Sequence, residues 1–133
     1  MKRVFADTFY WIALTSPTDA AHARASRYTD DIVTTDELLG EYLTFFCSRP
    51  EYVRRKAAMN LAAILQDSAV RVIPQSRESF LAGLDLYRAQ PDEGYSLTDC
   101  VSMQTMRRDG LTEVLTNDRH FEQEGFCVLL RDL

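Results

Sequence analysis

The segment Arg3-Val-Phe-Ala-Asp-Thr-Phe-Tyr-Trp11 decides how the rest of the chain is interpreted. Its run from Val4 to Ala6 is apolar at every position, which is typical of a strand buried between two helical layers. The run ends on a carboxylate, Asp7. Ligands of open α/β sheets bind at the carboxyl ends of the strands, so we expect a site at this edge if other acids meet Asp7 there.

Length and composition favour one domain over residues 1–133. The 133 residues, 46% of them apolar, can bury a full core without metal or disulfide support. No apolar run approaches the roughly 20 residues that span a bilayer, and no signal-like segment follows Lys2 and Arg3, so we expect a cytoplasmic protein without membrane contact. The odd number and wide spacing of Cys47, Cys100 and Cys127 predict three buried thiols rather than disulfides or a zinc site.

The charge balance argues against one class of nucleic-acid binder. A net charge of -5 and a pI of about 5.0 argue against a protein that binds nucleic acid by overall electrostatic attraction. They do not exclude a nuclease, because acids around a metal ion contribute to such a balance. Local basic groups could still hold a backbone, although each is equally well explained as part of a solvated helix face. These groups are Arg54, Arg55, Lys56, Arg107, Arg108 and Arg119.

Strands and helices are predicted to alternate along the chain. After the first strand, helices are expected at Asp19–Tyr28, Asp36–Cys47 and Tyr52–Gln66, after the cap Ser76, and from Ser96 to Arg108. Strands are expected at Ile32–Thr35, Val70–Ile73, Glu113–Thr116 and Phe126–Leu130. The predicted inward faces include Leu38, Leu39, Tyr42, Phe45 and Phe46 on one helix and Phe80, Leu84 and Tyr87 on another. Alternation of this kind predicts an α/β fold with a mainly parallel sheet covered on both faces.

Four acids lie where such a fold could bring them together. Asp7 ends the first strand, Asp118 follows the fourth, Asp99 lies in the first turn of a helix, and Glu41 borders an apolar helix face while Glu37 points further toward solvent. Each has an ordinary explanation as a cap, a turn residue or a surface acid, and Ser96-x-x-Asp99 matches a capping box.

Convergence of these acids would require protons or a shared cation. Carboxylates a few Å apart repel by several kcal/mol at an effective dielectric constant near 20. A hard divalent ion suits such a set, either Mg²⁺ or, as the alternative, Mn²⁺, bound singly or as a pair.

Four short motifs resemble the PIN domain, particularly its small VapC-like members. They are Val4-Phe5-Ala6-Asp7-Thr8, Val33-Thr34-Thr35 followed by Glu41, Ser96-Leu97-Thr98-Asp99-Cys100, and Leu115-Thr116-Asn117-Asp118-Arg119-His120-Phe121. The resemblance covers essentially the whole chain in the correct order. It implies a three-layer α/β/α fold with a five-stranded parallel sheet, and a Mg²⁺- or Mn²⁺-dependent endoribonuclease.

The resemblance also implies residue roles and partners. Asp7, Asp99 and Asp118 would surround the metal, Glu41 would be the remaining catalytic acid, and three polar residues would support them. These supports are Thr8, Ser96 and Thr116. VapC-like proteins are commonly dimeric toxins held inactive by an antitoxin, so an RNA substrate, a cognate antitoxin and a homodimer are expected.

Some interpretations stay open. A phosphoacceptor receiver domain would show paired acids after the first strand and a late lysine, whereas the only lysines are Lys2 and Lys56. A non-catalytic PIN-like module, or an RNA-processing nuclease without an antitoxin, remains an alternative. Arg119 and His120 could contact substrate, but we interpret both as surface residues. The helices expected at Asp36–Cys47 and Tyr52–Gln66 could form interfaces or be buried in the monomer.

Overall fold

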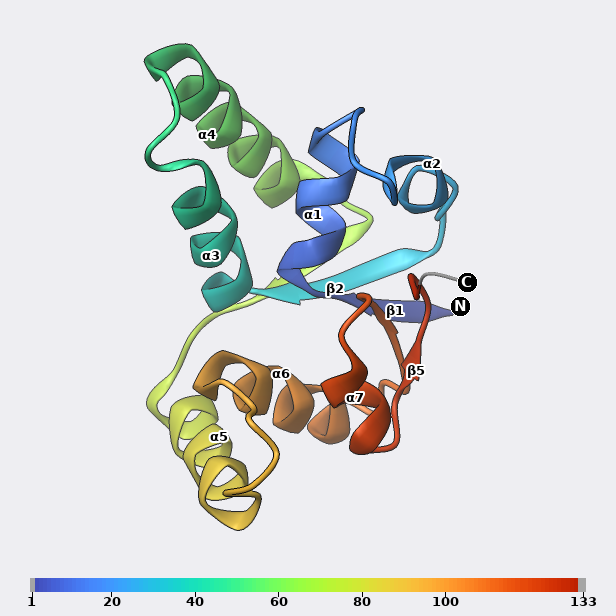
Figure 1. Cartoon of the computed structure of the whole chain (residues 1–133), viewed down its shortest axis with the longest axis vertical. Helices are drawn as coiled ribbons and strands as arrows, with labels where there is room; N and C mark the ends of the chain where they lie inside the picture. The colour runs from blue at the N-terminus through green and yellow to red at the C-terminus, as the bar shows by residue number, and fades with distance from the viewer. Residues whose placement is uncertain (1, 132–133) are drawn as a thin grey trace.

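The computed structural model describes residues 2–131, which form a five-stranded parallel sheet between two layers of helices (Figure 1). The strand order is β3-β2-β1-β4-β5, with every pairing parallel. The strands are β1 (Arg3–Ala6), β2 (Asp31–Thr35), β3 (Val70–Ile73), β4 (Glu113–Leu115) and β5 (Cys127–Val128). The α/β/α fold expected from the sequence is therefore confirmed.

Helices cover both faces of the sheet. One layer holds α1 (Thr8–Thr15), α2 (His22–Ala25), α3 (Asp36–Phe46) and α4 (Glu51–Gln66), and the other holds α5 (Arg77–Ala89), α6 (Leu97–Arg108) and α7 (Arg119–Gln123). Within residues 2–131, every helix is too short or too polar to span a membrane.

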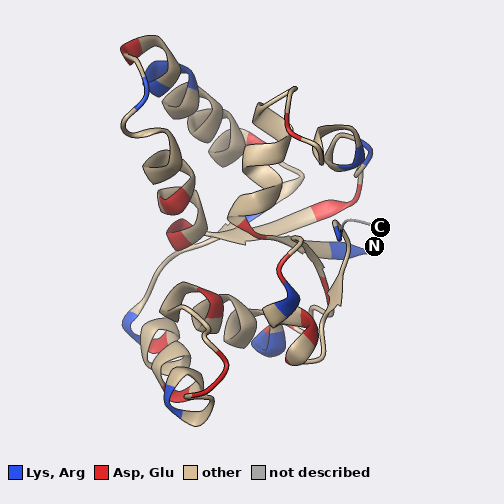
Figure 2. Ribbon diagram, in the orientation of Figure 1, with Lys and Arg blue, Asp and Glu red and all other residues tan. Residues whose placement is uncertain are grey.

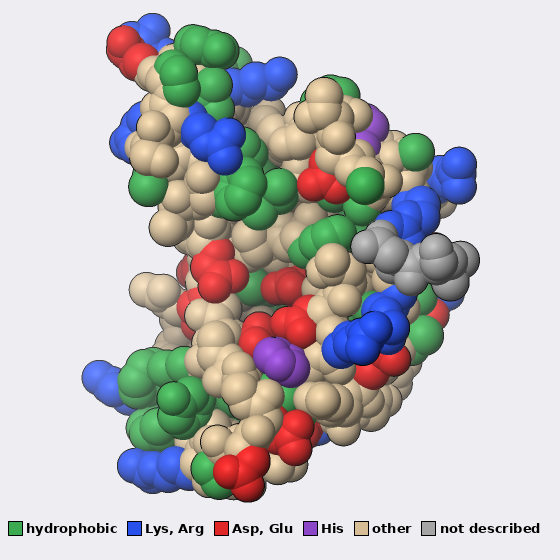
Figure 3. All heavy atoms as spheres, viewed as in Figure 1, with side chains coloured by type: hydrophobic (Ala, Val, Ile, Leu, Met, Phe, Trp, Pro, Cys, Tyr) green, Lys and Arg blue, Asp and Glu red, His purple; other side chains and the backbone are tan. Residues whose placement is uncertain are grey.

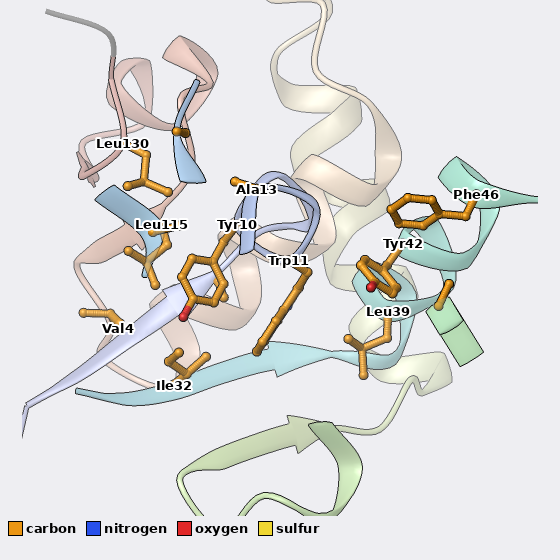
Figure 4. Close-up of a cluster of buried hydrophobic side chains, with 14 residues drawn as sticks. Val4, Tyr10, Trp11, Ala13, Ile32, Leu39, Tyr42, Phe46, Leu115 and Leu130 are labelled. Carbon is orange, nitrogen blue, oxygen red and sulfur yellow. The ribbon is translucent and has the colours of Figure 1, made fainter. Parts of the chain in front are cut away.

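Alternation along the strands separates two hydrophobic cores. Val4 and Ala6 face the α1–α4 layer, whereas Phe5, between them, packs with α5, α6 and α7. Figure 4 shows the first core, in which Trp11 of α1 and Tyr42 of α3 lie over the sheet. The residues Val4, Phe5 and Ala6 of β1 are fully buried, as the apolar run predicts.

The order of the strands reverses direction next to β1. The chain passes from β1 outward to β2 and β3, and then returns to place β4 on the other side of β1. The carboxyl ends of β1 and β4 therefore meet at a topological switch point, where open α/β sheets bind ligands. Asp7 and Asp118 follow these two strands.

Three regions of secondary structure differ from the sequence prediction. The segment after Asp7 continues directly as α1, which was not predicted because Thr8, Phe9, Tyr10 and Ile12 are residue types that favour strands. The predicted helix Asp19–Tyr28 is wrong over most of its length, since it contains turns and only the short α2. The last strand is likewise shorter than Phe126–Leu130.

Several side chains expected to be buried are exposed. Phe45 of α3 is 45% exposed, and Phe80 and Tyr87 of α5 are 41% and 50% exposed. The buried face of helix α5 instead consists of Ser79, Gly83 and Leu86, because the helix packs against α6 through the small residue Gly83. The prediction of three buried thiols is also wrong, because Cys47 and Cys127 are exposed and only Cys100 is buried.

Candidate metal centre

Asp7 lies at the junction of β1 and α1, at the N-cap position of the helix. Its Oδ2 accepts a hydrogen bond of 2.8 Å from the hydroxyl of Thr116. Burial raises the pKa of Asp7 to about 7, the hydrogen bond from Thr116 opposes that rise, and the negative charges of Asp99 and Glu41 add to it. Near neutral pH Asp7 is therefore only partly charged, and a nearby cation would favour its charged form.

Thr116 connects the ends of the two central strands. Its side chain is fully buried directly after β4. While its hydroxyl donates to Asp7, the hydroxyl oxygen accepts the backbone N–H of Asp118 at 3.2 Å. One small polar side chain therefore fixes the position of both acids.

Asp99 and Asp118 approach the same point from two helix N-termini. Asp99 belongs to the capping box of α6, in which its Oδ2 accepts the N–H of Ser96 at 3.2 Å and its own N–H donates to Ser96 Oγ at 3.0 Å. Asp118 caps α7, where its Oδ1 accepts the N–H of His120 at 2.9 Å. Burial raises the pKa of Asp99, and the charge of Asp118 adds to the rise.

His120 completes this group: its side chain is partly exposed, as a surface residue would be, but its Nδ1 is buried against the acids. Its Nδ1 lies 3.4 Å from Asp118 Oδ1 and 3.6 Å from Asp99 Oδ2. One potential ligand atom from each of Asp99, Asp118 and His120 lies within 4.8 Å of the others. The sequence signal was its position two residues after Asp118, but that spacing does not reveal which way the ring turns.

Glu41 joins the site from α3. Thr8 Oγ1 lies 2.9 Å from Glu41 Oε1 and 2.9 Å from the carbonyl oxygen of Leu38, so one hydroxyl links the start of α1 to α3. Partial burial of the carboxyl group raises the pKa of Glu41, the Thr8 hydrogen bond opposes this rise, and the charge of Asp99 adds to it.

Glu37 is less exposed than Glu41, contrary to the expectation that it points further toward solvent. It lines a separate pocket of about 630 Å³ together with Gln75, Ser76, Arg77 and Phe80. The structure therefore gives Glu41, and not Glu37, a hydrogen bond to a residue beside Asp7.

The acids occupy one face of the molecule, between the two helical layers. Figure 2 shows acidic positions at the end of β1, at the beginnings of α3 and α6, and after β4. Figure 3 shows acidic side chains gathered across the middle of this face, with a histidine beside them. The donor set of carboxylates and one imidazole fits a divalent cation, because it combines oxygen ligands with accumulated negative charge and a buried ring nitrogen.

Comparisons with known proteins agree with this architecture. The structure is similar to that of Mycobacterium tuberculosis VapC20, described as a toxin that cleaves the sarcin-ricin loop, with a TM-score of 0.81 and 28% sequence identity over 92% of this chain and 95% of that one. A toxin-antitoxin complex from Klebsiella pneumoniae shares the fold, with a TM-score of 0.63 and 14% identity over 87% of each chain. No protein-family model and no curated protein sequence matches the chain. The resemblance to VapC-like PIN domains indicated by the motifs is confirmed by the first of these structures.

Proposed function

From this resemblance and the geometry of the site, we propose that the chain is a metal-dependent endoribonuclease that hydrolyses phosphodiester bonds in RNA and acts as the toxin of a toxin-antitoxin pair. The supporting observation is that ligand atoms of Asp99, Asp118 and His120 lie within 4.8 Å of one another at the switch point of the sheet, while Thr116 joins Asp7 to Asp118. Mg²⁺ is the proposed ion and Mn²⁺ the alternative.

The proposed roles divide the acids into two groups. Asp99 and Asp118 hold the ion directly, and Asp7 holds it or the surrounding water with a carboxylate oriented by Thr116. When bound, the ion supplies Lewis-acid stabilisation of charge on a phosphate and lowers the pKa of water. Glu41, held by Thr8, accepts or supplies a proton beside the reacting water. Ser96 keeps Asp99 at the beginning of α6, where the helix dipole favours its charged form.

Because of the same acids, we expect a cation to bind before the RNA substrate does. An RNA phosphate is an anion, and several carboxylates at one edge of the sheet repel it. A bound divalent ion offsets this repulsion and gives the phosphate a partner. We therefore expect both the binding and the cleavage of RNA to depend on the ion.

An antitoxin and a second copy of the chain are the proposed protein partners, and the cytoplasm is the proposed location. The α1–α4 layer leaves large apolar side chains uncovered on two helices, and a pocket of about 230 Å³ lies between these helices. The exposed side chains are Leu43, Phe45, Tyr52, Met59 and Leu65. Apolar surface of this kind supports a protein contact.

Cleavage of RNA by the purified protein tests the catalytic proposal. We expect cleavage of single-stranded or structured RNA with Mg²⁺ or Mn²⁺, and complete loss with EDTA that is reversed by excess metal. The variants Asp7→Asn and Asp99→Asn should lose cleavage while keeping the circular dichroism spectrum of the wild type. Retained activity in both variants would refute the assigned roles, and RNA binding without cleavage would favour a non-catalytic module.

Genetic context separates the toxin from an RNA-processing enzyme. A toxin should be encoded beside a small open reading frame, and its expression should arrest growth until the product of that frame is co-expressed. Expression of Asp99→Asn serves as the control, because it should not arrest growth. Cleavage activity without growth arrest would support the RNA-processing alternative.

A further inference from the structure

The imidazole of His120 is partly exposed, but its Nδ1 is buried and faces the acidic site. We propose that His120 binds the divalent ion through Nδ1, so that the centre is a mixed nitrogen and carboxylate site. This inference rests on the proposed function, because it adds a residue to the same metal centre. It also alters the expected chemistry, since the motifs alone suggest ligands with oxygen atoms only.

The first support is the position of the ring nitrogen. Nδ1 lies 3.4 Å from Asp118 Oδ1 and 3.6 Å from Asp99 Oδ2, on the side of the ring that faces both acids. It is shielded from solvent and, among the residues that the structure describes, has no hydrogen-bond partner of acceptable geometry. A buried polar atom without a partner is uncommon and calls for an explanation. A shared cation between the three groups satisfies all of them.

The second support is the way the ring is held. The backbone N–H of His120 donates to Asp118 Oδ1, which anchors the residue at the start of α7. Tyr95, only 5% exposed, contacts the ring edge to face with centroids 5.1 Å apart. The Tyr95 hydroxyl in turn donates to Glu124 Oε2 at 2.9 Å, and Arg107 Nη2 donates to Glu124 Oε1 at 2.7 Å. This chain of contacts fixes the orientation of the imidazole before any ion binds.

The third support is the chemistry of the donor set. A neutral imidazole that carries its proton on Nε2 presents the Nδ1 lone pair to a metal. Imidazole nitrogen favours transition metals, whereas Mg²⁺ prefers oxygen ligands. With His120 as a ligand, the site should therefore bind Mn²⁺ more tightly than Mg²⁺ by a wider margin than carboxylates alone would give.

His120 has a second conceivable role with the same geometry, and this role is the alternative outcome of the experiment. A protonated His120 could act as a resident cation between Asp99 and Asp118, and it would then be displaced or repelled when a metal ion binds. The two roles differ in one observable property, the presence or absence of a bond between the metal and a histidine nitrogen.

The chain offers an internal control for this measurement, because it contains two histidines. His22 is on α2, in the opposite helical layer, and its Nδ1 lies 2.8 Å from the carbonyl oxygen of Ala13. In the full-length protein with ¹⁵N-labelled histidine and bound Mn²⁺, pulsed electron paramagnetic resonance should show coupling to one directly bound imidazole nitrogen. The coupling should persist in His22→Phe and disappear in His120→Phe.

Metal titrations give the second measurement. His120→Phe keeps a ring for the contact with Tyr95 and should bind Mn²⁺ at least about tenfold more weakly, with a smaller loss for Mg²⁺. Full binding of Mn²⁺ to the wild type without nitrogen coupling, or unchanged affinity in His120→Phe, would overturn the role of His120 while leaving the metal centre intact. If the wild type bound neither ion, the metal-dependent function would fail together with this inference. The measurement on labelled wild type decides the question even if His120→Phe does not fold.

Discussion

The carboxyl group of Asp7 is placed where its charge is costly. It lies between a buried strand and a helix, accepts one hydrogen bond from Thr116, and is repelled by Asp99 and Glu41. These conditions suit a group that works with a cation and penalise it when the cation is absent. A residue of this kind links the function of the site to the stability of the fold.

The stability of the metal-free protein is expected to fall as the pH rises. Because the pKa of Asp7 is raised from 3.8 to about 7 on folding, the folded state binds this proton more tightly than the unfolded chain does. The stabilisation is complete below about pH 4 and is lost as the pH approaches 7, and the raised pKa values of Asp99 and Glu41 act in the same direction.

The variant Asp7→Asn tests whether Asp7 makes the metal-free protein less stable as the pH rises. In EDTA at pH 8 the variant should be more stable than the wild type, by up to about 4 kcal/mol, and the difference should shrink toward pH 5. Urea unfolding at several pH values measures both proteins. Parallel pH profiles for wild type and variant would contradict the account of Asp7.

The two glutamates of α3 offer a matched pair for catalysis. Glu41→Gln should lower the rate of RNA cleavage by about 10²–10⁴-fold, because it removes a group that can transfer a proton while keeping the contact with Thr8. Glu37→Gln should leave the rate within a few fold, since Glu37 lines a separate pocket. Single-turnover cleavage with saturating metal measures the two variants, and equal losses would show that Glu41 has no special role.

The sequence predicted part of the candidate site because that part depends on local structure. Asp7 and Asp118 follow strands, and Ser96 with Asp99 forms the predicted capping box, so their placement needs only the parallel sheet. His120 could not be placed in this way. The direction of its ring depends on packing against Tyr95, a contact between segments distant in sequence.

At the scale of elements, strands were predicted more reliably than helix faces. The bounds of β3 were predicted without error, because Val70, Val72 and Ile73 are β-branched and Pro74 stops the strand. Helix α1 was missed, since its residues favour strands and only the tertiary context makes them helical. The buried face of α5 was wrong because hydrophobicity pointed to Phe80 and Tyr87, whereas close packing required Gly83.

Gly83→Ala should weaken the contact between α5 and α6. A Cβ atom at this position would lie 2.5 Å from Val101 Cγ2 and 3.0 Å from the Val101 backbone nitrogen, so the helices would have to separate. We expect a loss of about 1–3 kcal/mol in the free energy of unfolding. Chemical denaturation monitored by circular dichroism measures the change.

Gly40→Ala is the control for the same substitution. Gly40 lies within α3, and a Cβ atom there would meet nothing within 4 Å. The variant should be more stable than the wild type by about 0.5–1 kcal/mol, because alanine favours the helix. Equal effects at the two glycines would show that packing against Val101 does not determine the outcome.

For the molecule as a whole, the site lies at the carboxyl-terminal edge of the sheet, between the two helical layers. Asp7 follows β1, Glu41 belongs to α3 in one layer, and Asp99 belongs to α6 in the other. Thr116 and Thr8 connect these parts through hydrogen bonds. In the proposed assignment, an ion would bind Asp99 and Asp118 of one layer and lie beside Asp7, which precedes α1 of the other, so its binding energy should stabilise the folded chain.

Metal binding should therefore cause a large thermal shift. At a free ion concentration about 100 times the Kd, binding adds about 2.7 kcal/mol, which for a chain of this size corresponds to a rise of about 10 °C in Tm. The rise should be larger at pH 8 than at pH 5, because protons on Asp7 and Asp99 compete with the ion. Differential scanning calorimetry with Mn²⁺ or Mg²⁺, against NaCl at matched ionic strength, separates ion binding from screening. Asp99→Asn should lose most of the shift and Glu37→Gln should keep it, so an equal shift in both would place the stabilising ion somewhere other than this site.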